Sequence, residues 1–170
     1  MTTTETLTGE RADLLETLRQ HRWFLRFTAQ GLTDEQAASS PTASALSIGG
    51  LIKHVAAVEE GWVRFVEHGP SAMEFDPESV EHHQRNFRME PGETLESILS
   101  RYDEIAAYTD KLVETVDLDL SHPLPSAPWF PEGKTRSARR VFVHIVAETS
   151  QHAGHADIIR ETIDGQKTMG

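Results

Sequence analysis

The chain has 170 residues, a net charge of −11 and no cysteine. This length suits one domain, spanning residues 1–170, that buries a core of its own. The acidic charge argues against a nucleic-acid partner, because proteins that bind nucleic acids usually carry a basic surface. The lack of cysteine excludes disulfides, thiolate metal sites and a cysteine nucleophile.

No apolar run approaches the roughly 18 residues that a bilayer-spanning helix needs, so we expect no membrane partner. The first residues, "MTTTETLTGERADLLETL", have neither the basic n-region nor the apolar h-region of a secretory signal. The sequence therefore predicts a cytoplasmic protein.

Four amphipathic helices are predicted from apolar residues at helical spacing, separated by breaks rich in proline, glycine and serine. In chain order they run from about Thr8 to Gln30, Ser47 to His68, Pro91 to Val116 and Ser137 to Ile163. The sequence contains no βαβ alternation and no internal repeat. It predicts an all-α fold, a four-helix bundle with long loops between the helices.

Two features lie outside the predicted core. The connection at 119–139 contains four prolines. It is either a linker pinned by Trp129 and Phe130 or a lid over a site, which these aromatic residues would then wall. Trp23 and Phe27 face away from the apolar stripe of the first helix, which indicates a homodimer contact or packing beneath a loop.

The last predicted helix carries four titratable side chains on the face that should be buried. Taking about 100° per residue and His144 as zero, Glu148 lies near 40°, His155 near 20° and His152 near 80°. Burying a carboxylate costs several kcal/mol unless a basic partner, a hydrogen-bond network or a metal ion offsets the loss of hydration.

A metal ion is one explanation of this polar stripe. His54 of the second helix also points inward, and a Glu–x3–His pair such as Glu148 and His152 places two ligand atoms one turn apart. Three protein ligands leave a position open, as in catalytic zinc sites. The spacing alone leaves the register undecided, because His144 pairs with Glu148 equally well and His152 with His155 at i, i+3. Two histidines and a carboxylate also match non-haem iron sites, and a metal-free core network is the alternative.

Two segments resemble a known family. "LSIGGLIKHVAAVE" (46–59) and "VFVHIVAETSQHAGHADIIRETIDG" (141–165) are similar to the DinB-like (YfiT-like) metalloprotein superfamily. The similarity is greatest to the actinobacterial branch that includes mycothiol S-transferases and mycothiol-dependent maleylpyruvate isomerase. It extends over nearly the whole chain in helix order.

The resemblance implies a four-helix bundle that holds a divalent ion, usually zinc, through His54, Glu148 and His152. His144 and His155 would then orient ligands or face the substrate, and each is a candidate catalytic acid or base. Two further residues, Asp157 and Arg160, belong to the same family motif. The helical wheel places them outward, which predicts a capping or salt-bridge role.

The implied function is that of a zinc-dependent thiol S-transferase, with another divalent metal possible in place of zinc. A low-molecular-weight thiol, expected to be mycothiol, would be deprotonated at the metal and would attack a small electrophile, as in detoxification. This fits the lack of cysteine, because the sulfur then comes from a cosubstrate. The alternatives are a thiol-dependent isomerase, a metal-dependent hydrolase and a non-enzymatic, metal-free binding or stress module.

Overall fold

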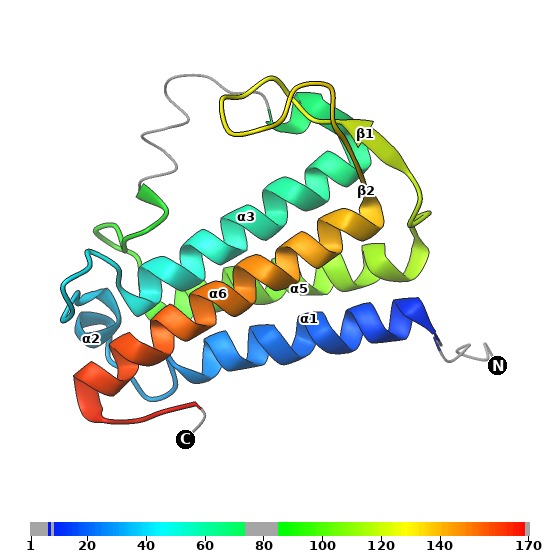
Figure 1. The fold of residues 1–170 in the computed structure, drawn as a ribbon. Helices are drawn as coiled ribbons and strands as arrows, with labels where there is room; N and C mark the ends of the chain where they lie inside the picture. The colour runs from blue at the N-terminus through cyan, green and yellow to red at the C-terminus, as the bar shows by residue number, and fades with distance from the viewer. Residues whose placement is uncertain (1–6, 8, 74–84, 169–170) are drawn as a thin grey trace.

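The computed structural model describes residues 7, 9–73 and 85–168 (Figure 1). Within them, four long helices form a bundle: α1 (Glu10–Phe27), α3 (Ile48–His68), α5 (Leu95–Thr115) and α6 (Ala138–Asp164). Helix α6 packs against both α1 and α3, and α5 closes the bundle by packing against α3 and α1. The predicted all-α four-helix bundle is confirmed. Among the described residues, no helix combines the length and apolar character that crossing a membrane requires.

Side-chain caps fix where α3, α5 and α6 begin. Ser47 accepts a hydrogen bond from the backbone N–H of Gly50, and Ser137 accepts one from that of Arg140. Each cap satisfies a backbone donor that the first helical turn leaves without a partner. Helix α5 begins four residues later than its predicted start at Pro91, because Thr94 forms its capping box.

Short elements complete the connections. Helix α2 (Asp34–Ala38) follows α1, and the 3₁₀ helix η1 (Gly69–Met73) continues α3. Strands β1 (Ser121–Pro123) and β2 (Thr135–Ser137), which the sequence did not predict, pair antiparallel with His122 opposite Arg136. Figure 1 shows this strand pair at one end of the bundle and α2 at the other. Because β2 runs directly into α6, the pair fixes the start of the helix that carries the polar stripe.

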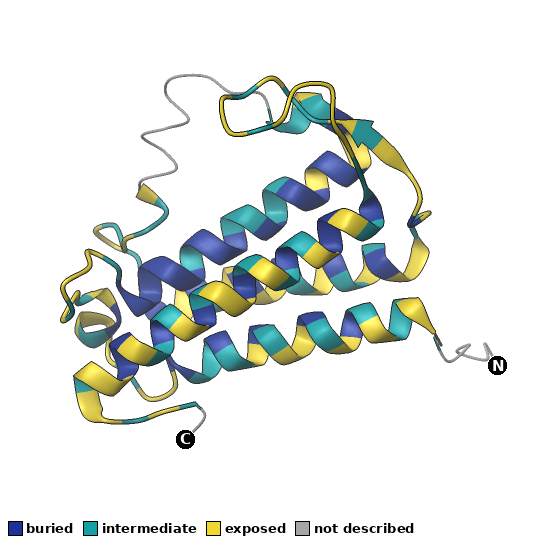
Figure 2. Ribbon diagram, in the orientation of Figure 1, coloured by how far each residue is buried: buried dark blue, intermediate teal, exposed yellow. Residues whose placement is uncertain are grey.

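The interior contains a charged layer between two apolar clusters. One cluster includes Leu25 and Leu51, and the other includes Leu18 and Phe142, all essentially inaccessible to solvent. Between them, Arg22 of α1 donates through Nη2 to Glu59 Oε1 of α3 at 2.5 Å. Figure 2 shows the buried faces of the helices turned toward one another.

The aromatic residues of the 119–139 connection differ in their surroundings. Phe130 packs against Trp62 of α3 with ring centroids 5.9 Å apart, whereas Trp129 is 60% exposed. Phe130 therefore ties the connection to the bundle. On α1, Trp23 is 53% exposed and stacks at a tilt on Phe27. The predicted homodimer contact stays a prediction.

Candidate metal centre

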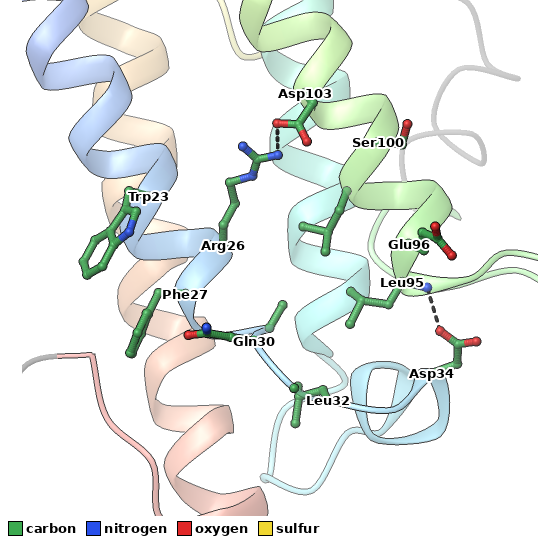
Figure 3. Close-up of a pocket in the computed structure, with 13 residues that line it drawn as sticks. Trp23, Arg26, Phe27, Gln30, Leu32, Asp34, Leu95, Glu96, Ser100 and Asp103 are labelled. Carbon is green, nitrogen blue, oxygen red and sulfur yellow. Dashed lines mark hydrogen bonds and ion pairs between the residues drawn. The ribbon is translucent and has the colours of Figure 1, made fainter.

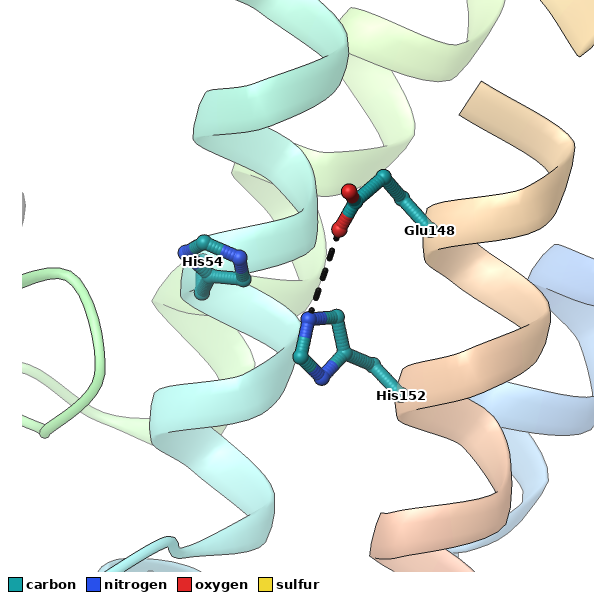
Figure 4. Close-up of side chains that lie close together, drawn as sticks. All are labelled: His54, Glu148 and His152. Carbon is teal, nitrogen blue, oxygen red and sulfur yellow. Dashed lines mark ion pairs between the residues drawn. The ribbon is translucent and has the colours of Figure 1, made fainter. Parts of the chain in front are cut away.

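Two helices bring His54, Glu148 and His152 together. Glu148 and His152 lie one turn apart on α6, and His54 approaches from the adjacent helix α3 (Figure 4). One candidate ligand atom from each residue lies within 4.8 Å of the others, and His152 Nε2 is 3.5 Å from Glu148 Oε2. Ligand atoms about 2.1 Å from a tetrahedral zinc ion lie about 3.4 Å apart. Small side-chain rotations would therefore let the three residues hold one such ion.

The charge and burial of the cluster also suit a cation. A hydrogen bond with His152 lowers the pKa of Glu148, burial opposes this, and His144 adds to the lowering. The carboxylate is therefore anionic at neutral pH, and two imidazoles and one carboxylate are common ligands of divalent transition metals. His54 is buried, whereas 28% of the Glu148 side chain is exposed. A ligand would reach the cluster from the Glu148 side.

Phe87 packs against one face of the His54 imidazole and also contacts the His152 ring. Its ring stacks on His54 with centroids 3.9 Å apart and an interplanar angle of 20°, while His152 meets His54 edge-on at 4.9 Å. The backbone around Phe87 reaches α3 because Gly50 has no side chain: a Cβ there would overlap the carbonyl oxygen of Phe87. The Gly49–Gly50 pair was the signal in the sequence that a segment packs closely on α3.

A methyl group at Gly50 is expected to destabilise this packing. Gly50→Ala should lower the free energy of unfolding by about 1–3 kcal/mol, because the neighbouring atom is backbone and has little freedom to move aside. Gly61→Ala is the matched control in the same helix, since a Cβ there meets nothing within 4 Å. The Gly61→Ala change should raise the free energy of unfolding by about 0.5–1 kcal/mol, because alanine favours a helix more than glycine does. Urea unfolding measures both, and equal stabilisation by the two changes would contradict the packing described.

His144 and His155 flank the cluster on opposite sides along α6. His144 Nε2 lies 3.7 Å from Glu148 Oε1, and its ring meets Trp62 edge-on with centroids 5.0 Å apart. Burial lowers the pKa of His144, Glu148 raises it, and the charges of Arg136 and Arg140 lower it further. His155 Nδ1 lies 3.5 Å from His152 Nδ1. His144 is close enough to orient Glu148, and His155 is close enough to orient His152. Either histidine could also exchange a proton with a molecule bound at the cluster.

Arg160 is buried, so its predicted outward position is wrong. Its Nη1 donates to the carbonyl oxygens of Thr28 and Gln30 at 2.8 Å each, and its Nε donates to Asp164. The helical wheel missed this because the turn that follows α1 covers that face of α6. The ion pair with Asp164 and the hydrogen bonds to the carbonyl oxygens after α1 agree with the salt-bridge or capping role that we expected of Arg160. Asp157 accepts a hydrogen bond from the backbone N–H of Thr168 at 2.7 Å, which is also a structural contact.

A surface pocket elsewhere in the molecule has no comparable chemistry. It encloses about 740 Å³ between the end of α1, the start of α5 and the segment leading to α2 (Figure 3). Three of its charged side chains have partners within the lining: Arg26 pairs with Asp103, and Asp34 accepts from the backbone N–H of Leu95 at 2.7 Å. None of the clustered histidines lines it. We therefore place the candidate site at the cluster between α3 and α6.

Comparisons with known proteins identify the family of the chain. A family model described as Mycothiol-S-transferase matches residues 13–165, a range that includes the whole cluster and both flanking histidines. No curated protein matches the chain. A crystal structure described as that of a conserved protein from Enterococcus faecalis covers 94% of this chain and 100% of its own, with a TM-score of 0.64 and 16% identity. At that identity the likeness concerns the fold alone.

Proposed function

The chain belongs to the mycothiol S-transferase family, within the DinB/YfiT-like superfamily, and we propose that it joins a low-molecular-weight thiol, mycothiol, to a small electrophile with the help of a divalent metal, zinc in the first instance. The observation that carries the proposal is the meeting of His54, Glu148 and His152 within 4.8 Å. The chain itself has no cysteine, so the reacting sulfur would belong to the cosubstrate.

His54, Glu148 and His152 would hold the ion, which when bound would lower the pKa of a thiol at its open position. Glu148 contributes the negative charge of the ligand set, and the buried His54 closes its inner side. The stacked Phe87 ring excludes water from one face of His54. These residues hold the ligand atoms in place before substrate arrives.

His144 or His155 would move the proton. The thiol proton passes to an imidazole nitrogen, the sulfur forms a bond to the electrophilic carbon, and the leaving group departs with its bonding electron pair. If the electrophile is an activated double bond, the same imidazole returns the proton to carbon. Both histidines lie beside a proposed ligand, at 3.7 Å from Glu148 and 3.5 Å from His152 respectively, which supports this role.

A conjugation assay tests the proposal. Mycothiol and 1-chloro-2,4-dinitrobenzene are mixed with zinc-loaded protein and, separately, with chelator-treated protein. We expect one thioether formed per chloride released, only with metal present and only with thiol. Loss of chloride without thiol would instead indicate a hydrolase. Equal rates with and without metal would reject the metal-dependent mechanism.

A further inference from the structure

Arg136 in β2 lies against the aromatic wall beside the candidate metal centre. Its Cζ atom is 4.6 Å from the centre of the Trp62 ring and 5.6 Å from that of Phe130. Its Nη1 is buried and has no hydrogen-bond partner among the described residues. A buried N–H without an acceptor is destabilising, so native proteins seldom keep one without a reason.

The positive charge at this position is also uncompensated. Within the described part of the chain, neither Arg136 nor Arg140 forms an ion pair with a carboxylate. Arg139, between them in sequence, pairs with both Glu10 and Asp119. Burial lowers the pKa of Arg136, and the nearby charge of Arg140 lowers it further. Among the described residues, two nearby arginines therefore have no carboxylate partner, although the chain carries a net charge of −11.

A row of contacts joins Arg136 to the candidate metal centre. The guanidinium lies on Trp62, the Trp62 ring meets His144 edge-on with centroids 5.0 Å apart, and His144 Nε2 is 3.7 Å from Glu148. Arg136 and Glu148 are therefore the two ends of one chain of side-chain contacts between β2, α3 and α6.

We propose that Arg136 binds a carboxylate group of the electrophile that reacts at this centre, an inference that rests on the proposed function. The Trp62 and Phe130 rings hold the guanidinium by cation–π contacts, and its Nη1 group has no hydrogen-bond partner among the described residues, so it can donate to a ligand. A planar fork of N–H donors matches the two oxygens of a carboxylate, and Arg136 is half-buried, which strengthens such a pair. The substrate class is thus a small electrophile that carries a carboxylate.

Calorimetric titration with an unreactive probe tests this directly. The acid 3,5-dinitrobenzoate and its uncharged amide are titrated into wild-type protein, Arg136→Gln and Arg64→Gln, where Arg64 is an exposed arginine of α3. We expect wild type to bind the acid at least tenfold more tightly than the amide. Arg136→Gln should bind the acid at least tenfold more weakly and the amide unchanged, while Arg64→Gln should match wild type. Arg136→Lys, which keeps the charge but loses the fork, should fall in between and serves if Arg136→Gln does not fold.

Equal affinity of wild type and Arg136→Gln for the acid would overturn the inference. The same result is expected if the carboxylate of the acid binds the metal and not Arg136, so that case also overturns it. A second titration in saturating mycothiol identifies which substrate uses Arg136. If mycothiol leaves the affinity for 3,5-dinitrobenzoate unchanged, Arg136 binds the electrophile. If mycothiol competes with 3,5-dinitrobenzoate, Arg136 binds the thiol and our assignment is overturned. The probe does not react, so its binding is measured independently of thiol conjugation. If the protein binds the probe through Arg136 but conjugates no thiol, the proposed function is rejected and the carboxylate site at Arg136 stands.

Discussion

A Glu148→Gln variant is expected to lose at least about 100-fold in kcat/KM for thiol conjugation. The change keeps the size of the side chain but removes the negative charge that makes the cluster a cation site. Residues that merely orient a metal ligand already cost 10–100-fold when they are changed, so a ligand should cost at least the upper end of that range. Steady-state rates with mycothiol and 1-chloro-2,4-dinitrobenzene measure the effect.

Glu161→Gln is the matched control, because Glu161 is an exposed glutamate of the same helix that pairs with Lys167. Its kcat/KM should equal that of wild type. A Glu148→Gln enzyme that retains wild-type activity would show that the carboxylate is not needed, and the metal-dependent mechanism would then be wrong.

Arg22→Met is expected to lower the free energy of unfolding by about 3–5 kcal/mol. Arg22 and Glu59 are both buried, and Arg22 donates to Glu59 through Nε and Nη2. Burial alone would lower the pKa of Arg22, but the charges of Glu59 and Asp110 outweigh it and raise the pKa. Removing the arginine leaves Glu59 charged and without its partner in the bundle interior, which is the costly way to break a buried ion pair. Urea unfolding at pH 7 measures the change.

Arg19→Met provides the control within the same helix. Arg19 pairs with Asp110, one of the two partners of Arg22, but 60% of its side chain is exposed, so its loss should cost about 0–1 kcal/mol. The double variant Arg22→Met/Glu59→Leu should recover most of the lost stability, because no charge is then left buried without a partner. If the Arg22→Met and Arg19→Met variants had equal free energies of unfolding, the buried ion pair would not have the importance that we give it.

The fold was predictable because its signals are local. Apolar residues at helical spacing and the caps at Ser47 and Ser137 place the helices to within a few residues. The spacing of Glu148 and His152 predicts a shared face, because two residues one turn apart on α6 cannot face different ways. The approach of His54 followed from the apolar neighbours that surround it on α3.

Contacts between distant segments were not predictable in this way. Phe87 reaches His54 through a close approach at Gly50, and Arg160 is covered by a turn that follows a different helix. Arg136 lies over Trp62 only because β1 and β2 pair, and strands of three residues carry too little pattern to be recognised. Arg22 and Glu59 are ordinary surface residues by type, and only the bundle shows that they are buried together.

The most direct test of the central claim is the metal content per chain, measured by mass spectrometry on untagged wild-type, Glu148→Ala and His155→Ala proteins. The three-residue site predicts about one zinc, or one other divalent ion, per wild-type chain. Glu148→Ala should lose that ion and His155→Ala should keep it. Wild-type protein that holds no metal even after incubation with zinc would contradict the site, and with it the proposed thiol transfer.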